Sequence, residues 1–294
     1  MRLIDEISFF LKEHGFVFTT RLHDGHEVIS TESAGKGEGR SILPLEISAA
    51  TPEVAAQLAD SAGSCIRSIH ESDGFPLIIT EDRWHSQKEM TRARLLAHLE
   101  TFTPAYARNC EIHRIEKAEA QQFLRENHSY GYAACRYHYG MFLKRHTGHR
   151  SNDLAPGTLV AVATFSNARK WKKQDKVIRS YEWTRYASLP YLRISGGMGK
   201  MLKAFIEEVK PDDIMSYADL EWSEGNVYES LGFVLEGCKE PVLFSVNPVS
   251  WERSPVRTGS TEVSGRDVIA EGNGNLYFRN FGSAKWRMKI TDYE

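Results

Sequence analysis

A glycine-rich turn joins a predicted strand to the helix with the clearest amphipathic pattern in the sequence. The strand YEWTRYAS (181–188) is followed by SGGMGKML (195–202), which opens a helix predicted over 196–209. Because N–H groups at a helix start have no intrahelical acceptor and the helix dipole is positive there, the turn is predicted to bind an anion such as a phosphate. Close packing of the helix on the strand would need the same glycines without a ligand.

Two common nucleotide-binding patterns do not fit this turn. Gly196, Gly197 and Gly199 do not make G-x-G-x-x-G, and Met201 follows Lys200 where a P-loop has serine or threonine. Hydride transfer and nucleotide hydrolysis therefore lose support.

The turn and a later segment together resemble the GNAT acyltransferase superfamily. The turn has the spacing Gly197-x-Gly199-x-x-Leu202, and YESLGF (228–233) begins 29 residues after Gly199. The resemblance implies an α/β (α+β) fold with a mixed central sheet and flanking helices, and acetyl-CoA or another acyl-CoA as the cofactor. The family usually has Arg or Gln three positions before the first glycine of this spacing, where the chain has Ile194.

The resemblance also implies roles for individual residues. Tyr228 would hydrogen-bond or protonate the thiolate that leaves during acyl transfer. The residues expected to hold the cofactor belong to the turn and to the start of a later short helix: Ser195, Gly196, Gly197, Met198, Gly199, Lys200 and Asn226.

Four further segments resemble the Mom-type GNAT proteins of phages: NHSYGY (127–132), LVAVATFS (159–166), YEWTR (181–185) and SYADLEWSEGNVYESLGF (216–233). This resemblance covers about residues 106–245 and implies modification of an adenine amine in DNA. Two alternatives stay open. One is an N-acetyltransferase that acts on a small-molecule or protein amine, and the other is a non-catalytic nucleic-acid-binding module with the same fold.

Three more side chains could act on the attacking amine. Glu182 lies on the predicted strand, Asp219 ends a strand predicted over 213–219, and His128 follows the first helix of the second domain. An amine that attacks a thioester needs an acceptor for its proton and polarisation of the carbonyl. We expect these residues and Tyr228 to be catalytic. The alternatives are an ion pair of Glu182 with Arg185 or another cation, a cap by Asp219, loop hydrogen bonds by His128 and core packing by Tyr228.

A basic segment favours nucleic acid, specifically DNA, as the partner. RKWKKQDKVIR (169–179) has six basic residues and one acid, and the predicted binding residues are Arg169, Lys170, Trp171, Lys172 and Lys173. Phosphate neutralisation and base stacking use these residue types. A base inside a duplex must leave the stack before its amine can react, and Tyr130, Tyr132 or Trp222 could stack on it. A solvated hairpin tip is the alternative.

The elements that must position these residues follow from hydrophobic spacing and turn signals. Residues 105–294 are expected to form β-α-β-β-α-β-α-β and a hairpin appendage, NLYFRNFGSAKWRMKI (275–290). Thr51-Pro52-Glu53 has the cap, proline and acid of a helix start. The predicted domains are a small α+β domain over 1–104 and a GNAT-like domain over 105–294.

The first domain is expected to be a degenerate nuclease-like module or a docking module. Residues 77–95 resemble the junction that follows nuclease-like modules in phage relatives of the second domain. Metal-dependent nucleases of that type need E-x-K, and Glu46-Ile47-Ser48 lacks the lysine. Nuclease activity is therefore not predicted.

Composition narrows the protein class further. With 37 basic and 39 acidic residues the net charge is −2, so any nucleic-acid surface must be local. No run of about 18 apolar residues and no secretory signal pattern is present, which predicts a cytoplasmic protein without a membrane partner. Four cysteines without a C-x-x-C pair, and His138, His146 and His149 without a common face, predict no metal site. Oligomeric state is left open.

Overall fold

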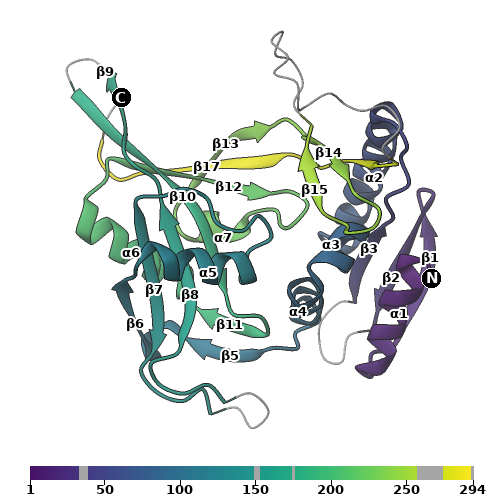
Figure 1. Ribbon diagram of the computed structural model, residues 1–294, viewed down its shortest axis with the longest axis horizontal. Coiled ribbons are helices and arrows are strands. Elements are labelled where there is room, and N and C mark those ends of the chain that lie inside the picture. The colour runs from purple at the N-terminus through teal and green to yellow at the C-terminus, as the bar shows by residue number, and fades with distance from the viewer. Residues whose placement is uncertain (33–38, 149–152, 174–175, 257–273, 293–294) are drawn as a thin grey trace. The chain divides into compact units, whose positions relative to one another are not determined.

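The computed structural model describes residues 1–32, 39–148, 153–173, 176–256 and 274–292 (Figure 1). Its contacts divide the chain into two compact units. The first is Met1–Thr91 with Asp219–Glu224 and Lys239–Ser283, and the second is Arg92–Ala218 with Gly225–Cys238 and Ala284–Glu294. Each unit is therefore discontinuous in sequence, unlike the linear division at residue 104 that the sequence predicts.

The first unit begins with a helix, a four-stranded sheet and a long second helix. The sheet has the order β1-β2-β3-β4, in which the first three strands are antiparallel and β4 is parallel to β3. The elements are α1 (Leu3–Glu13), β1 (Phe18–His23), β2 (His26–Thr31), β3 (Arg40–Leu45), α2 (Pro52–Asp73) and β4 (Leu77–Thr80). The predicted start of α2 is confirmed, because the Thr51 side chain accepts a hydrogen bond from the Val54 N–H at 3.4 Å.

Two short helices and a small sheet complete the first unit. The helices are α3 (Glu81–Ser86) and α4 (Lys88–His98), of which α4 runs across the boundary after Thr91. In the sheet, β14 (Leu243–Val246) lies between β15 (Arg253–Pro255) and β16 (Leu276–Arg279), and all pairs are antiparallel. The hairpin predicted over 275–290 is wrong. Asn280 Oδ1 accepts the N–H groups of Val242 and Gly282, which ends β16 beside β14, and β17 (Ser283–Lys289) joins the large sheet instead.

The second unit is built on a mixed sheet with helices packed against it. The strand order is β13-β17-β12-β10-β8-β7-β6, with β9 paired to one half of β10; β10 is parallel to β12 and antiparallel to β8 and β9. The strands are β6 (Cys110–Arg114), β7 (Tyr137–Leu143), β8 (Leu159–Phe165), β9 (Arg169–Lys173), β10 (Lys176–Ser188), β12 (Asp213–Asp219), β13 (Val234–Lys239) and β17. This mixed α/β architecture confirms the predicted fold class.

Helices and a minor sheet surround this framework. The remaining elements are β5 (Thr103–Tyr106), the 3-10 turn η1 (Ala107–Asn109), α5 (Lys117–Asn127), β11 (Leu192–Ser195), α6 (Gly197–Val209) and α7 (Asn226–Ser230). β5 and β11 form a two-stranded parallel sheet, so β11 delivers the chain to the start of α6 (Figure 1).

The two faces of the large sheet pack against different helices. On one face, Phe205 of α6 stacks on Phe165 with ring centroids 3.8 Å apart, and Phe165 stacks in turn on Trp183 at 5.4 Å. On the other face, a buried cluster joins α5 to β8 and β10: Ala120, Phe123, Leu124, Val162 and Ala187. Within the part of the chain that is described, no helix is long and apolar enough to cross a bilayer.

Candidate functional site

The central strands of the second unit separate part-way along their length. β10 and β12 pair only through Ser180–Glu182 and Asp213–Met215, whereas β10 stays paired with β8 as far as Ser188. Just past the last ladder pair, Ser216 Oγ lies 2.9 Å from the carbonyl oxygen of Trp183. The serine hydroxyl therefore satisfies a carbonyl that has lost its strand partner, at the point where the sheet opens.

Tyr228 places its hydroxyl group at this opening. Its oxygen lies 2.9 Å from Ser216 Oγ, and its ring stacks on Trp286 at 6.0 Å and meets Phe233 edge-on at 5.4 Å. Burial raises the pKa of Tyr228, and the hydrogen bond to Ser216 only partly opposes that rise. The ring is half-buried and packs on Trp286 and Phe233, and the protonated hydroxyl group lies beside Ser216 where the strands separate.

The helix that carries Tyr228 needs a glycine before it. Gly225 has a φ of +84°, and a Cβ there would lie 2.6 Å from Trp286 Nε1 and 2.9 Å from Ala218 Cβ. A side chain at this position would push α7 away from β12 and β17, so the glycine fixes where Tyr228 stands.

The start of α6 has the backbone geometry of an anion site. Gly196 precedes the helix in the left-handed region with a φ of +74°, and within the described chain no side chain caps the helix there. A Cβ on Gly197 would lie 2.8 Å from the Tyr186 hydroxyl oxygen, and one on Gly199 would lie 3.2 Å from Leu231 Cδ2. Close packing therefore explains two of the glycines, and among the described residues no side chain accepts from the N–H groups at the start of α6.

The other predicted cofactor residues have different surroundings. Lys200 donates from Nζ to the carbonyl oxygens of Ala107 at 2.9 Å and Cys110 at 2.5 Å, so its ammonium group holds η1 against α6. Ser195 ends β11 and is exposed, Met198 is half-buried in the first turn of α6, and Asn226 is exposed at the start of α7. The Lys200 side chain is therefore already used to hold η1.

Glu182 occupies the last paired position of β10 before the opening. Its register partner on β12 is Met215, and its backbone N–H donates to Ser166 Oγ at 2.9 Å. Among the described residues its carboxylate makes no hydrogen bond and no ion pair, and the expected alternative of an ion pair with Arg185 is not formed. Glu182 is half-buried and can accept a proton.

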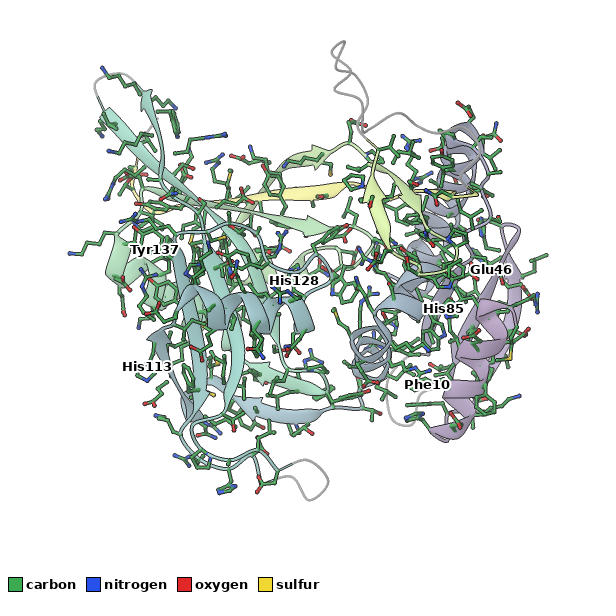
Figure 2. The ribbon with its side chains drawn as sticks, in the orientation of Figure 1. Phe10, Glu46, His85, His113, His128 and Tyr137 are labelled. Atoms are coloured by element: carbon green, nitrogen blue, oxygen red, sulfur yellow. The ribbon has the colours of Figure 1, made fainter. Side chains whose placement is uncertain are left out.

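His128 holds the loop after α5 (Figure 2). Its N–H donates to the carbonyl oxygen of Leu124 at 3.0 Å, its carbonyl oxygen accepts from Gly131, and its ring Nδ1 accepts the N–H of Tyr130 at 3.1 Å. A ring that accepts at Nδ1 carries its proton on Nε2 when neutral. His128 thus matches the loop alternative, and Nδ1 is not available as a base.

Asp219 caps a turn within the first unit. One carboxylate oxygen accepts from Arg83 Nη2 at 3.1 Å and the other accepts the N–H of Glu221 at 3.1 Å, and its carbonyl oxygen accepts from Trp222 and Ser223. These contacts correspond to the capping alternative, because both carboxylate oxygens are used by the fold.

The same turn enters a buried group of charges. Glu221 is 1% exposed and contacts Arg83 Nε at 3.1 Å and Arg253 Nη1 at 2.8 Å, and Arg253 also binds the buried Asp82. Burial alone would raise the pKa of Glu221, but the two guanidinium groups outweigh it and hold that pKa below its usual range.

The predicted nucleic-acid segment forms one strand of a two-stranded ribbon. β9 pairs with the first half of β10, from Arg169 opposite Ser180 to Lys173 opposite Lys176. No ion pair is found within the described chain for the basic side chains Arg169, Lys170, Lys172 and Lys176, while Trp171 lies opposite Ile178. The strand that carries Glu182 at the opening, β10, therefore begins in this ribbon.

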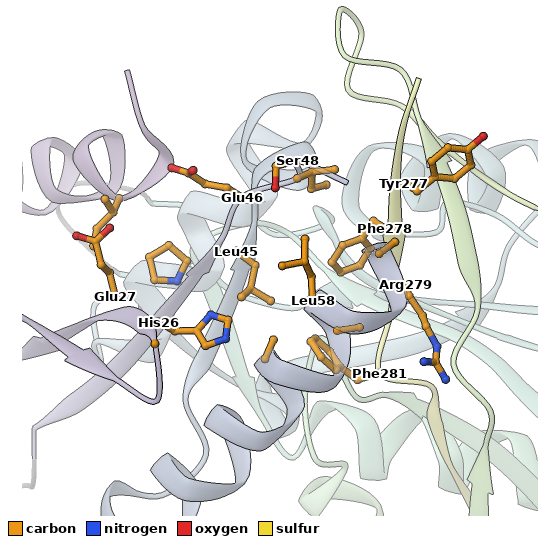
Figure 3. Close-up of a pocket in the computed structure, with 17 residues that line it drawn as sticks. His26, Glu27, Leu45, Glu46, Ser48, Leu58, Tyr277, Phe278, Arg279 and Phe281 are labelled. Carbon is orange, nitrogen blue, oxygen red and sulfur yellow. The ribbon is translucent and has the colours of Figure 1, made fainter. Parts of the chain in front are cut away.

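A cavity of about 310 Å³ lies within the first unit, next to the incomplete nuclease motif (Figure 3). Glu46 and Ser48 line one end, His26 points in from the opposite side, and Leu45, Leu58 and Phe278 supply apolar walls. Glu46 accepts the N–H of Leu3 at 3.1 Å, so it caps α1. No group of three His, Cys, Asp or Glu suited to a metal occurs among the described residues, and His149 lies outside them.

Comparison with known proteins gives only distant similarity. No protein-family model and no curated protein matches the sequence. A mutant of the AtaT toxin, solved with the C-terminus of the antitoxin AtaR and acetyl-CoA, shares 13% identity over 58% of this chain and 93% of its own, with a TM-score of 0.28. A structure of histone acetyltransferase HPA2 and related acetyltransferase, from Corynebacterium glutamicum ATCC 13032, shares 13% identity over 84% and 97%, with a TM-score of 0.31. At this low identity and TM-score, neither protein assigns an activity to the chain.

Proposed function

We propose that the chain is an acyl-CoA-dependent N-acyltransferase of the GNAT type, with acetyl-CoA or another acyl-CoA as its cofactor. The observation that carries this proposal is the hydroxyl group of Tyr228, held by Ser216 where β10 and β12 separate. The uncapped start of α6 belongs to the same unit and supplies N–H groups for a pyrophosphate. The residues present therefore fit this cofactor, which supplies an acyl group activated as a thioester.

Tyr228 and Ser216 form a pair that can deliver a proton to a departing sulfur. The Ser216 hydroxyl hydrogen can point to the Trp183 carbonyl oxygen or to the Tyr228 oxygen, both 2.9 Å away. When the Ser216 hydroxyl donates to the Tyr228 oxygen, the Tyr228 hydroxyl hydrogen can donate to a different acceptor. Because burial raises the pKa of Tyr228, this hydrogen is present throughout the ordinary pH range.

Glu182 is the residue best placed to accept a proton from the attacking amine. Among the described residues its carboxylate makes no hydrogen bond and no ion pair, and it stands one residue before Trp183 at the opening. His128 and Asp219 are assigned structural roles, since their acceptor atoms serve the loop after α5 and the turn after β12.

The proposed acceptor is a nucleobase amine, and adenine in DNA is the target that the resemblance to Mom-type proteins favours. The basic ribbon supports this assignment, because two-stranded ribbons enter the major groove and unpaired Lys and Arg neutralise phosphates. Glu182 follows Lys176 by six residues on β10, a distance along a strand of about 20 Å. An acceptor base in duplex DNA must leave the stack to reach Glu182.

The test is acyl transfer by the purified chain from isotopically labelled acetyl-CoA to single-stranded and duplex oligonucleotides. Digested nucleosides are analysed by mass spectrometry, with Tyr228→Phe as the inactive control. With DNA oligonucleotides the proposal predicts labelled 2′-deoxyadenosine with the wild-type protein and almost none with the variant. Label on a peptide or small amine but not on any nucleoside would replace the nucleobase by that acceptor, and loss of acyl-CoA binding would remove the enzyme assignment.

A further inference from the structure

We propose that Arg185 forms an anion subsite beside Glu182, which binds the phosphate of the nucleotide that carries the acceptor amine. This inference rests on the proposed function, because it names a group that the acceptor must contain. It concerns Arg185, to which the sequence analysis assigns no role beyond an ion pair with Glu182.

A bulge in β10 brings these two side chains to one face. Trp183 pairs with Phe165 and Arg185 with the next residue of β8, Thr164, so Thr184 is an extra residue. Trp183 packs on the α6 face through Phe165, yet Ala187, four residues later, packs in the α5 cluster on the other face. Regular alternation would keep Trp183 and Ala187 on one face, so the bulge reverses it.

The reversal fixes the positions of Glu182 and Arg185. Glu182 precedes Trp183 and therefore faces away from α6, and Arg185 is two residues before Ala187 and shares its face. Both side chains thus lie on the face of β10 that α5 and the loop after it cover. They flank the position at which β12 leaves β10.

The guanidinium group of Arg185 has hydrogen-bond donors that the fold does not use. Nε donates to the Gly131 carbonyl oxygen at 3.0 Å and Nη1 to the Thr184 carbonyl oxygen at 2.8 Å. A guanidinium group has five N–H donors, so three remain after these two bonds. Arg185 is half-buried, and no carboxylate lies within ion-pair distance of it in the described chain.

This lack of a counter-charge sets Arg185 apart from other enclosed arginines of the chain. Arg83, Arg253 and Arg287, whose side chains are 4%, 11% and 16% exposed, each contact at least one carboxylate. Burial lowers the pKa of Arg185, and the nearby Cys135, Glu182 and Tyr130 only partly oppose that effect. A partly desolvated cation without a partner favours an anionic ligand, and the planar fork of arginine fits a phosphate.

The loop that accepts from Arg185 also presents an aromatic ring. Tyr130 precedes Gly131 and is 40% exposed, and it lies close enough to Arg185 to influence its charge. An exposed ring next to a cation with unused donors is the combination that holds a stacked base and its phosphate. A nucleotide is therefore favoured over an amine without an anionic group.

The inference is tested by NMR titration of 2′-deoxyadenosine 5′-monophosphate and 2′-deoxyadenosine, which needs no turnover. We expect the wild-type protein to bind the monophosphate at least tenfold more tightly than the nucleoside. Arg185→Gln should abolish this preference, and Arg185→Lys, which can still hold the loop, should keep part of it. The exposed Arg125→Gln on α5 is the matched control and should keep it all.

The outcomes separate this inference from the proposed function. If Arg185→Gln keeps the tenfold preference, or the wild-type protein shows none, the anion subsite is wrong. If the wild-type protein shows the preference and Arg185→Gln loses it, but no acyl group is transferred to any nucleotide, the subsite stands and the proposed activity fails. An unchanged unfolding midpoint for Arg185→Gln excludes general misfolding as the cause of its lost preference.

Discussion

Ser216 Oγ lies 2.9 Å from the hydroxyl oxygen of Tyr228 and 2.9 Å from the carbonyl oxygen of Trp183. One side chain thus joins β12, β10 and α7 at the point where the ladder between the two strands ends. The opening of the sheet and the placement of the tyrosine are therefore one structural feature.

Removing the hydroxyl group of Tyr228 should stop acyl transfer without affecting cofactor binding. Tyr228→Phe keeps the ring contacts with Trp286 and Phe233 but loses the proton donor, so kcat should fall by about 10²- to 10⁴-fold. Steady-state kinetics and calorimetric titration of acetyl-CoA measure the two effects. Ser216→Ala should give a smaller loss of kcat, and a Tyr228→Phe enzyme of normal kcat would show that the hydroxyl has no catalytic part.

The packing of Gly197 on Tyr186 can be tested by a double-mutant cycle. Gly197→Ala places a Cβ 2.8 Å from the tyrosine oxygen and should lower the free energy of unfolding by about 1–3 kcal/mol. Tyr186→Phe removes that oxygen, so the same glycine substitution should cost less in the Tyr186→Phe background. Urea unfolding measures both values. Equal costs in the two backgrounds would mean that this contact does not restrict the residue at position 197.

The buried charges around Glu221 should dominate the sensitivity of the first unit to substitution. Arg253→Met leaves Asp82 and Glu221 with one guanidinium partner fewer, and it should lower the free energy of unfolding by about 3–5 kcal/mol. The control is Glu207→Gln, which breaks an exposed pair with Lys203 and should cost no more than about 0.5 kcal/mol. Similar losses in the two variants would contradict this ranking.

The same group sets a pH dependence whose sign is fixed by the lowered pKa of Glu221. An acid with a lowered pKa in the folded state binds fewer protons than in the unfolded state. Its contribution to stability is present above the usual glutamate pKa of about 4.3 and is lost as the pH falls below that value. Urea unfolding between pH 7 and pH 3 should show this loss in the wild-type protein and a smaller one in Arg253→Met.

The ribbon should determine affinity for DNA and its dependence on salt. Lys170→Glu with Lys172→Glu reverses two charges that have no ion pair in the described chain, so DNA binding should weaken by at least tenfold at low salt. The slope of log Kd against log salt should decrease by about 2, because about one fewer counterion is released for each substituted lysine. Lys203→Glu, on an exposed side chain of α6, is the control. Equal affinity of the double variant and the control would remove the ribbon from the DNA site.

Local sequence signals predicted the elements that depend on neighbouring residues. The amphipathic helix after the glycine turn, the Thr51 cap of α2 and the strands β10 and β12 follow from spacing and caps alone, whereas β11 between β10 and α6 has no such signal. Each of these features is determined by residues close to it in the sequence, and periodicity and capping act over the same short range.

Features that depend on distant residues were not predictable in the same way. Asp219 meets Arg83, which is 136 residues away, so its role as a cap with an ion pair has no local signal beyond the turn. Ser216 reaches the Trp183 carbonyl oxygen because the ladder between β10 and β12 ends at Met215, and Arg185 lies on the α5 face because of the bulge at Thr184. Both features are set by pairing between strands. The predicted hairpin at 275–290 failed for the same reason, because alternation does not say which strand is the partner.

The central claim is tested most directly by calorimetric titration of acetyl-CoA into the wild-type protein, Gly199→Asn and Gly199→Asp. The two substitutions have nearly equal size and meet the same neighbour, Leu231, and an acid in the first turn of a helix favours the helix itself. If the first turn of α6 holds the pyrophosphate, the wild-type protein and Gly199→Asn bind acetyl-CoA with similar Kd, and Gly199→Asp binds at least tenfold more weakly. Equal Kd for the two variants, or no binding by the wild-type protein, would contradict the assignment of α6 as the cofactor site.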